Sequence, residues 1–536
     1  MLDRPTFTIS NVRSGDVVSY PLVLFDGQLH GASAATSVTV SRIGADHPRL
    51  RAHTYTAPSQ AWPVALDTGV FKALAFLVPG ENVIEFRAGA EPVAAIHRLV
   101  VHYLNAPWDY CVRAVYVVPA DDPVGGFQAP PHERCDIDSA VHRLALAMRL
   151  LQSALAELMH RHGLGRYTFC LEEPAQARAC PSEGGYEEVL VAYGVPVHVH
   201  RFKHSRAALQ ALSGDELYGR VGQALSGAPD RESRIDVALM SFTRKDAHTG
   251  MLYGHTALGG GRLALFGSGS MFSWPENLEQ VPRRFTDRTA VDGRRFLDDS
   301  AGRGEYWALA STSMGAVLHE LGHCLSLPHP HNGGGIMARG FDYLYRLFGV
   351  AEPQPGAEMQ APDEPRLDRS AATRLRFHSY LIRAGSEPHP ATLYPPHPPP
   401  APDGAVSVPV PSPSPTPTPP RPRLYVATNG LPARARAHHE AHSAPRRPSI
   451  TWQSEGVVRV SAPNGLGHIG YYLNGDVAAH EEFFQASAPV HLLDIPWREV
   501  CRQCGNPPAG AKIRISCVDH AGQIEEAFER QVGDRP

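Results

Sequence analysis

The segment His319–Met337, which reads HELGHCLSLPHPHNGGGIM, constrains the fold of this chain more than any other stretch. Residues four apart lie on one face of a helix, so a helix here would bring His319 and His323 together with Glu320 beside them. An apolar stripe on another face favours that helix, and Pro328 would end it. The stripe consists of Met314, Val317, Leu318, Leu321 and Leu325. The sequence therefore predicts a helix that carries two imidazoles and a carboxylate.

A catalytic zinc site needs three protein ligands and an open position, and this helix supplies two. His329 is the third candidate, because the chain that turns at Pro328 can bring it back toward the metal. His331, two residues further on, is a competing candidate, and we prefer His329. Three neutral imidazoles would hold one catalytic Zn2+ with a bound water, and Glu320 would accept the proton of that water.

The motif resembles that of a known class of enzymes. HELGHCLSLPH resembles the metzincin signature HExxHxxGxxH, and GGIM, with Met337 eight residues after His329, resembles the methionine turn. WALASTSMGAVLHELGH, GIMARGFDYL and GHTALGGGRLALFGSG also resemble a eukaryotic family of zinc metallopeptidases, in which some members carry a jacalin-like lectin domain. The resemblance covers roughly residues 106–385.

This resemblance implies a zinc-dependent metallopeptidase, of endopeptidase type, that acts on a protein or peptide substrate. Glu320 would assist attack of a zinc-bound water on the peptide bond. By the same resemblance, GHTALGGGRLALF would be the edge strand along which substrate lies, and a plain surface hairpin is the alternative. One residue departs from the signature. Its glycine is Ser326 here, and a serine in the left-handed conformation that this glycine adopts costs about 1 kcal/mol.

The chain divides into four segments by composition and pattern. Residues 1–105 read as short strands separated by turns, which predicts an antiparallel β-sandwich-like domain. Residues 106–385 mix helices and strands, residues 386–424 form a proline-rich linker, and residues 425–536 are again β-rich. The predicted fold class is therefore multidomain, with an α+β metzincin-like zinc peptidase domain flanked by β-sandwich-like domains.

Sequence signals indicate where two helices begin or end. Apolar residues at helical spacing follow Asp138 and Ser139, and Gly163 comes just past the last of them, which predicts a helix between these points. For the helix of the histidine motif, a hydroxyl residue within Ser311–Ser313 can cap the start.

Composition indicates which kinds of partner this protein can bind and in which cellular compartment we expect it. The chain has 536 residues, 43% of them hydrophobic, and a net charge of −4, so nothing favours nucleic acid or acidic lipid. No stretch approaches the roughly 18 apolar residues of a membrane helix. With no leader pattern, no N-x-[ST] site and eight scattered cysteines, the sequence favours a cytoplasmic protein.

Other histidines and cysteines carry weaker signals. HHEAH at 438–442 has its histidines three apart around the glutamate without an apolar stripe, and we interpret it as a solvated segment. His198 and His200 share one face of a strand with no recognisable partner acid, which favours packing or a surface position. The spacing of four further residues would suit a small second metal site, but their strand context favours reduced core thiols. They are Cys501, Cys504, Cys517 and His520.

Two alternative functions remain open at this point, one of a different class and one within the enzymes. In one, the β domains contact glycans or proteins and the zinc site is inactive or structural. In the other, the enzyme hydrolyses small amides. A complete ligand set with Glu320 retained favours the peptidase, because structural zinc sites usually fill the fourth position with a protein ligand.

Overall fold

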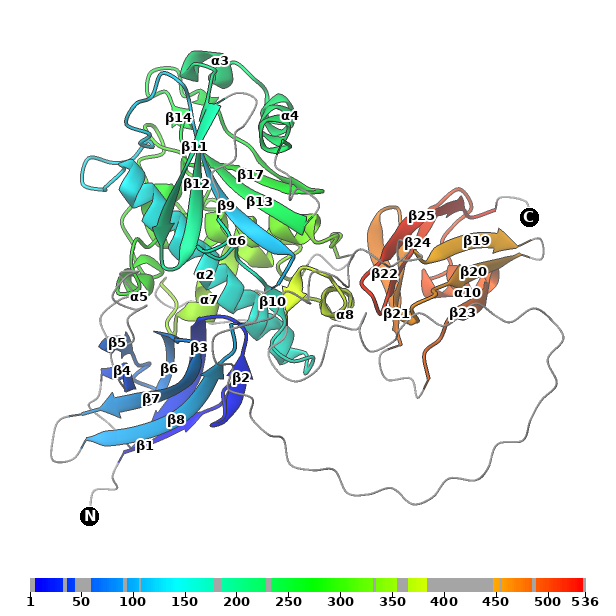
Figure 1. Ribbon diagram of the computed structural model, residues 1–536, viewed down its shortest axis with the longest axis horizontal. Helices are drawn as coiled ribbons and strands as arrows, with labels where there is room; N and C mark the ends of the chain where they lie inside the picture. The colour runs from blue at the N-terminus through cyan, green and yellow to red at the C-terminus, as the bar shows by residue number, and fades with distance from the viewer. Residues whose placement is uncertain are drawn as a thin grey trace.

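A computed structural model shows a multidomain, β-rich chain (Figure 1). It describes residues 5–31, 36–43, 59–89, 94–105, 108–177, 185–227, 233–330, 334–353, 365–382, 447–453, 456–483 and 488–533. The predicted linker at 386–424 and the HHEAH segment lie outside these residues. The described part contains no helix that is both long and apolar enough to cross a membrane.

The N-terminal strands form two sheets that face each other. One has the order β1 (Thr6–Ile9), β3 (Leu22–His30), β6 (Val70–Phe76). The other has the order β2 (Asp16–Val18), β8 (Ala95–Tyr103), β7 (Gly80–Ala88), β4 (Ser37–Ile43), β5 (Ser59–Pro63). Phe25 and Phe71 of the first sheet pack on Phe86 of the second, with ring centroids 5.4 and 5.9 Å away. The prediction of a purely antiparallel arrangement is wrong in one place, because β2 and β8 pair in parallel.

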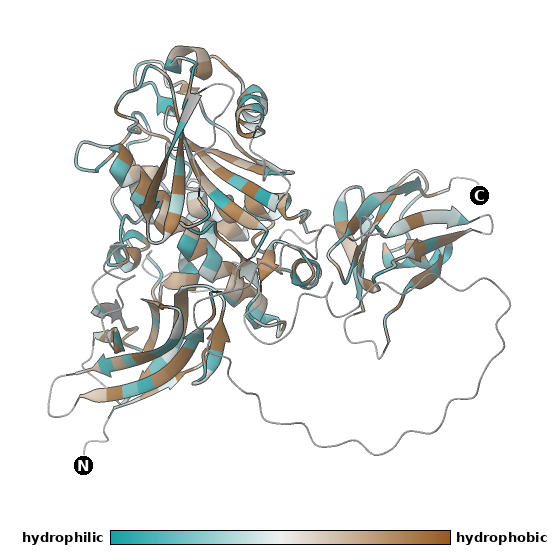
Figure 2. Ribbon diagram, viewed as in Figure 1, coloured by the Kyte–Doolittle hydropathy of each residue, from teal (hydrophilic) through white to brown (hydrophobic). Residues whose placement is uncertain are grey.

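The centre of the molecule is a six-stranded sheet. Its order is β11 (Gly185–Ala192), β12 (Val195–Phe202), β9 (Cys111–Val118), β13 (Arg234–Met240), β17 (Leu263–Gly267), β16 (Ala257–Gly260). The four inner strands run parallel, and β11 and β16 pair antiparallel at the two edges. Figure 2 shows mostly apolar residues with a few polar ones along these strands, as expected for a parallel sheet that is covered on both faces.

Helices cover both faces of this sheet, as Figure 1 shows. Side chains alternate along each strand, so Ala114 and Tyr116 pack with α2 (Ile137–Arg161) and α6 (Tyr306–Cys324). Val115 and Val117 pack on the other face with α3 (Arg206–Gln210) and α4 (Gly214–Leu225). The same hydrophobic cluster that includes α2 and α6 continues into the N-terminal strands.

The helix predicted after Asp138 is α2. It begins slightly earlier, at Ile137, because the side chain of Asp136 caps it by accepting a hydrogen bond from the Ser139 backbone N–H at 2.8 Å. Gly163, with φ of +70°, follows its C-terminus in the left-handed conformation that commonly ends helices.

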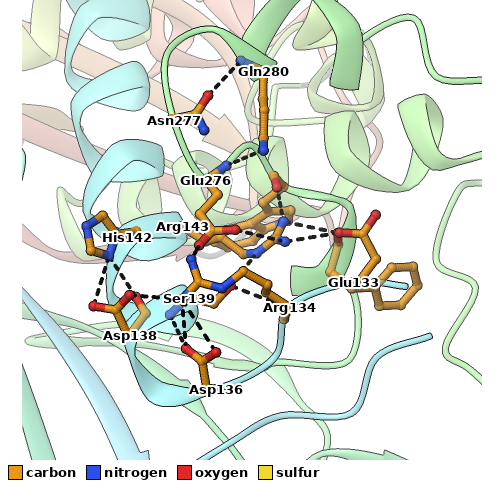
Figure 3. A network of polar contacts seen from close by, with 12 residues as sticks. Glu133, Arg134, Asp136, Asp138, Ser139, His142, Arg143, Glu276, Asn277 and Gln280 are labelled. Carbon is orange, nitrogen blue, oxygen red and sulfur yellow. Dashed lines mark hydrogen bonds and ion pairs between the residues drawn. The ribbon is translucent and has the colours of Figure 1, made fainter. Parts of the chain in front are cut away.

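A polar network ties the start of α2 to the segment that supports α6 (Figure 3). The guanidinium of Arg143, 1% exposed, lies 3.1 Å from Glu133 and 3.5 Å from Glu276. Arg134 makes a second ion pair with Glu276 at 2.5 Å. Beyond Glu276, the indole of Trp274 donates to the hydroxyl of Ser313 within α6 at 2.7 Å. The network therefore fixes α6 relative to α2.

Short elements connect these layers. They are β10 (Thr168–Phe169), β14 (Arg244–Lys245), β15 (Leu252–Tyr253), η2 (Met271–Ser273), α5 (Gln280–Arg284), η3 (Arg339–Tyr343), α7 (Tyr345–Phe348), α8 (Arg369–Arg376) and β18 (Leu381–Ile382).

The described C-terminal residues form a β-rich unit. A three-stranded sheet has the order β19 (Ser449–Gln453), β20 (Val457–Ser461), β23 (Leu492–Pro496), followed in the chain by α10 (Trp497–Gln503). A four-stranded sheet has the order β22 (Asp476–Glu482), β21 (Leu466–Leu473), β24 (Lys512–Asp519), β25 (Ile524–Gln531). Their buried side chains form a separate hydrophobic cluster. We call this unit the C-terminal β unit.

Candidate metal centre

Helix α6 carries the histidine motif and is almost entirely buried. It begins at Tyr306, five residues before the predicted cap, and no side chain caps it. The prediction of a cap within Ser311–Ser313 is therefore wrong, because these hydroxyls lie inside the helix and serve tertiary contacts. Ser311 donates to the backbone carbonyl of Asp342 at 2.8 Å, and Thr312 donates to the Asp342 carboxylate at 3.0 Å.

The structure brings the three predicted imidazoles together. The Nε2 atom of His323 lies 3.2 Å from that of His319 and 3.1 Å from that of His329, and the remaining pair is 3.3 Å apart. His319 is buried, His323 is half-buried and His329 is exposed. Among the residues that the structure describes, this is the one group of three or more side chains that could hold a metal ion.

The other ring nitrogens explain the orientation of His319 and His323. Nδ1 of His319 lies 2.8 Å from the backbone carbonyl of Ile336, and Nδ1 of His323 lies 2.8 Å from that of Leu327. A carbonyl can only accept, so Nδ1 carries the proton in both rings and Nε2 keeps a free lone pair. Both side chains are therefore oriented as metal ligands by the chain that follows the helix.

The donor geometry fits zinc. With Zn–N distances of about 2.0–2.1 Å, tetrahedral geometry places the nitrogens about 3.3 Å apart. The observed separations of 3.1, 3.2 and 3.3 Å match that spacing. Burial, opposed by the hydrogen bond that His319 donates to the carbonyl of Ile336, lowers the pKa of His319 to about 4, so this imidazole is neutral at neutral pH, as a ligand must be.

Ser326 has the predicted left-handed conformation, with φ of +60°. Two backbone hydrogen bonds shape the turn around it: Ser326 N–H donates to the carbonyl of His323, and Leu327 N–H to that of Gly322, both at 2.9 Å. The chain thus leaves α6 abruptly and returns His329 to the other two imidazoles.

Met337 packs directly beneath the helix at the level of the histidines. It is 2% exposed, and a Cβ built on Gly322 would lie only 2.4 Å from its sulfur. Gly335 has φ of +80°, and a Cβ there would meet the carbonyl of Arg366 at 2.5 Å. Glycine at both positions therefore lets the turn with Met337 pack tightly against α6.

Glu320 points toward the edge strand β16. Burial raises the pKa of its carboxyl to about 7, and a hydrogen bond from the backbone N–H of Gly259 partly offsets this. A Cβ on Gly259 would lie 2.2 Å from the backbone carbonyl of Glu320, so only glycine allows β16 to approach α6 this closely. The stretch around Gly259 was predicted as an edge strand, and it is one.

The remaining predicted residues do not join this centre. His331 lies outside the described residues, so the structure does not compare it with His329. His198 and His200 are buried on β12, and His198 has acid partners that its sequence neighbourhood did not reveal: Glu172, and Glu187 at 2.7 Å from Nδ1. Cys504 and Cys517 are core thiols and Cys501 is half-buried. These three cysteines and His520 form no metal-binding group in the described chain.

Comparison with known proteins identifies the family of this chain. A family model described as "Putative peptidase family" matches residues 6–412. The chain belongs to this family. A Schizosaccharomyces pombe relative named "putative zinc metalloproteinase" is 29% identical over 353 residues, which cover 64% of this chain and 54% of the relative. A Saccharomyces cerevisiae relative of the same description is 27% identical over 377 residues, which cover 66% of this chain and 50% of the relative.

The family predicted from the motifs, a eukaryotic family of zinc metallopeptidases, is thereby confirmed. The chain spans about half the length of these curated relatives. Among solved structures, a calcium-binding mutant of Bacteroides uniformis beta-glucuronidase 2 aligns with a TM-score of 0.13 at 9% identity, over 99% of this chain and 60% of that one. A score this low carries no argument about the fold.

Proposed function

We propose that this chain is a zinc-dependent, metzincin-like endopeptidase. In this proposal His319, His323 and His329 hold one Zn2+ ion and Glu320 is the general base. The convergence of three Nε2 atoms at tetrahedral spacing carries the proposal, because three imidazole nitrogens meet at one point where a single ion could bind them all. The family and the names of the yeast relatives support it.

Each residue has a defined task in the proposed reaction. Zinc, when bound, acidifies a water and polarises the scissile carbonyl. Glu320 accepts the proton of the attacking water and returns it to the leaving amine as the C–N bond breaks. The N–H of Gly259 holds the carboxylate beside the ligands. Leu327 and Ile336 keep the imidazoles aligned through their carbonyls.

Strand β16 is the proposed platform for the substrate. It is the last strand of the six-stranded sheet and pairs with β17 along one side only. A peptide can add to the other side as a further strand, which places its backbone beside Glu320. This mode needs an extended polypeptide and disfavours small amides as substrates.

The proposal also includes the organisation of the chain. It assigns the catalytic domain to residues 106–385, between β-rich domains at 1–105 and 425–536, with the linker at 386–424 and a cytoplasmic location. The continuous core that joins the N-terminal strands to α2 and α6 supports a fixed N-terminal domain.

Digestion of a peptide library by the zinc-loaded protein tests the proposed function, with Glu320→Ala as the matched control. We expect the wild type to cleave and the variant to retain zinc but lose activity, because the imidazoles are untouched. Equal cleavage by both proteins would eliminate Glu320 as the base. No cleavage by folded, zinc-loaded wild type would favour a binding scaffold with an inactive site.

A further inference from the structure

The C-terminal β unit lies beside helix α8 (Figure 1), and polar side-chain contacts join the two. Arg369 forms a two-pronged ion pair with Glu482, at 2.7 and 2.9 Å, and Thr373 donates to the same carboxylate at 2.7 Å. Arg374, 1% exposed, donates to Tyr472 at 2.9 Å and to a serine on β24 at 2.7 Å. A buried arginine with several fixed partners is typical of a permanent contact rather than of a loosely tethered module.

The chain after α8 interlocks with the same unit. Phe377 is 3% exposed and stacks on His520, with ring centroids 5.2 Å apart. A Cβ on Gly467 would lie 2.8 Å from the ring of Phe377, and one on Gly522 would lie 2.3 Å from its backbone carbonyl. The surfaces of α8 and the C-terminal β unit therefore fit together at van der Waals distance.

One strand of the unit also reaches the metal centre. β22 is the outer strand of its sheet, and Val477 near its start forms a parallel backbone bridge with Pro330. Pro330 directly follows His329. Glu482, the partner of Arg369, stands at the other end of β22. A single strand thus joins α8 to the backbone beside the third imidazole.

We propose that the C-terminal β unit is a positioning element of the metal centre, with β22 holding the backbone next to His329. The inference rests on the proposed function, since it takes His329 as a ligand. His319 and His323 are set by α6 and by carbonyl partners, whereas His329 follows a turn and is exposed. Outer contacts that orient a metal ligand commonly contribute 10- to 100-fold to metal affinity.

Charge reversal at the docking contact tests this role. Arg369→Glu should place two carboxylates face to face and undock the unit, and the double variant Arg369→Glu/Glu482→Arg should restore the pair. Thr373→Val, which removes one hydrogen bond to Glu482, is a milder second variant in case the reversal impairs folding. The matched control is Asp494→Lys, which breaks the exposed pair with Arg459 inside the same unit.

Two measurements on the full chain give the outcome. Zinc affinity by chelator competition should fall about 10- to 100-fold in Arg369→Glu, a few-fold in Thr373→Val and not at all in the control, and the double variant should recover most of the loss. Hydrogen exchange of the metal-free protein should rise at residues 325–330 in Arg369→Glu only.

Unchanged zinc affinity together with raised exchange along α8 would overturn the positioning role, because the unit would then be undocked without consequence. His329→Ala distinguishes this failure from failure of the proposed function. If His329→Ala loses zinc while undocking does not, only the positioning role is wrong. If His329→Ala keeps zinc, the ligand set itself is wrong.

Discussion

Two sites in this protein place histidines in opposite surroundings. At the metal centre, three imidazoles face one another without an acid among them, and backbone carbonyls hold the outer nitrogens of His319 and His323. On β12, His198 lies instead between the carboxylates of Glu172 and Glu187. The first arrangement leaves lone pairs for a cation, whereas the second supplies a counter-charge to a protonated ring.

The positive and negative side chains around His198 are paired with one another, and we call these residues together with His198 the β12 cluster. Arg113 lies 2.7 Å from Asp236 and 3.2 Å from Glu187, and all three side chains are at most 2% exposed. Burial lowers the pKa of His198, but hydrogen bonds to Glu172 and Glu187 outweigh it and the net shift is upward. The surroundings of His198 therefore favour the protonated form of the ring. The absence of acids among the three imidazoles leaves them able to hold a metal ion, whereas the carboxylates around His198 favour a structural role.

The largest expected effect is a loss of stability on mutation of the β12 cluster, without any change at the metal centre. Arg113→Ala leaves Asp236 and Glu187 buried without their guanidinium, which should cost about 3–5 kcal/mol of unfolding free energy. Zinc bound per folded molecule should not change. Denaturant unfolding and metal analysis check both points, with the exposed Arg459→Ala as a control that should leave stability unchanged. Loss of zinc at full stability would contradict the division of roles.

A change at Gly259 should act only on the metal centre. Gly259→Ala places a methyl group against the carbonyl of Glu320 and must displace the carboxylate, so kcat should fall about 10- to 100-fold. Zinc affinity should stay within about twofold, because the imidazoles keep their partners. Gly260→Ala is the matched control, since its Cβ would meet only the hydroxyl of Tyr218 at 3.7 Å. Equal activity of both variants would show that Gly259 does not position Glu320.

The contacts described above show which features the sequence could predict and which it could not. Helix α6 and the three histidines lie within one short segment, so periodicity and spacing predicted them, whereas the left-handed Ser326 was predicted from the resemblance to the metzincin signature. The acids around His198 and the contact of Arg369 with Glu482, 113 residues away, depend on tertiary packing. No local pattern encodes such pairs.

The start of α6 shows the same limit at short range. A hydroxyl residue before an apolar run predicts a cap, but the helix extends to Tyr306 because tertiary contacts, including that of Ser311 with the carbonyl of Asp342, occupy those hydroxyls. Packing here outweighs local capping preference.

The β12 cluster should respond to pH with a definite sign. A folded-state pKa above the unfolded value of about 6.5 stabilises the protein fully below that pH, and the contribution is lost as pH rises through the folded pKa. The stability difference between wild type and His198→Gln should therefore be largest below about pH 6.5. Above that pH it should shrink by about 1.4 kcal/mol per pH unit until the folded pKa is passed. Denaturant unfolding of both proteins from about pH 5.5 to about pH 9 measures this stability difference. That range brackets the unfolded pKa. A difference that grows with pH would show that His198 is buried neutral.

The smallest expected effect concerns Ser326. Ser326→Gly relieves strain at positive φ but adds freedom to the unfolded chain, so stability should change by less than about 1 kcal/mol, with zinc retained. Ser326→Val should cost about 1–3 kcal/mol and weaken zinc, because a β-branched residue fits that backbone poorly. Thermal unfolding measures the stability of each variant, and chelator competition measures its zinc affinity. Full tolerance of valine would mean that the left-handed turn is not needed to deliver His329.

X-ray absorption at the zinc edge tests the metal centre most directly. For the wild type we expect one zinc per chain with three imidazole nitrogens and one oxygen at about 2.0–2.1 Å, and no sulfur. His329→Ala should lose one imidazole contribution together with most of the bound metal. Sulfur at about 2.3 Å would instead assign the metal to cysteines such as Cys501 and Cys504. An unchanged spectrum and metal content in His329→Ala would contradict the three-histidine centre.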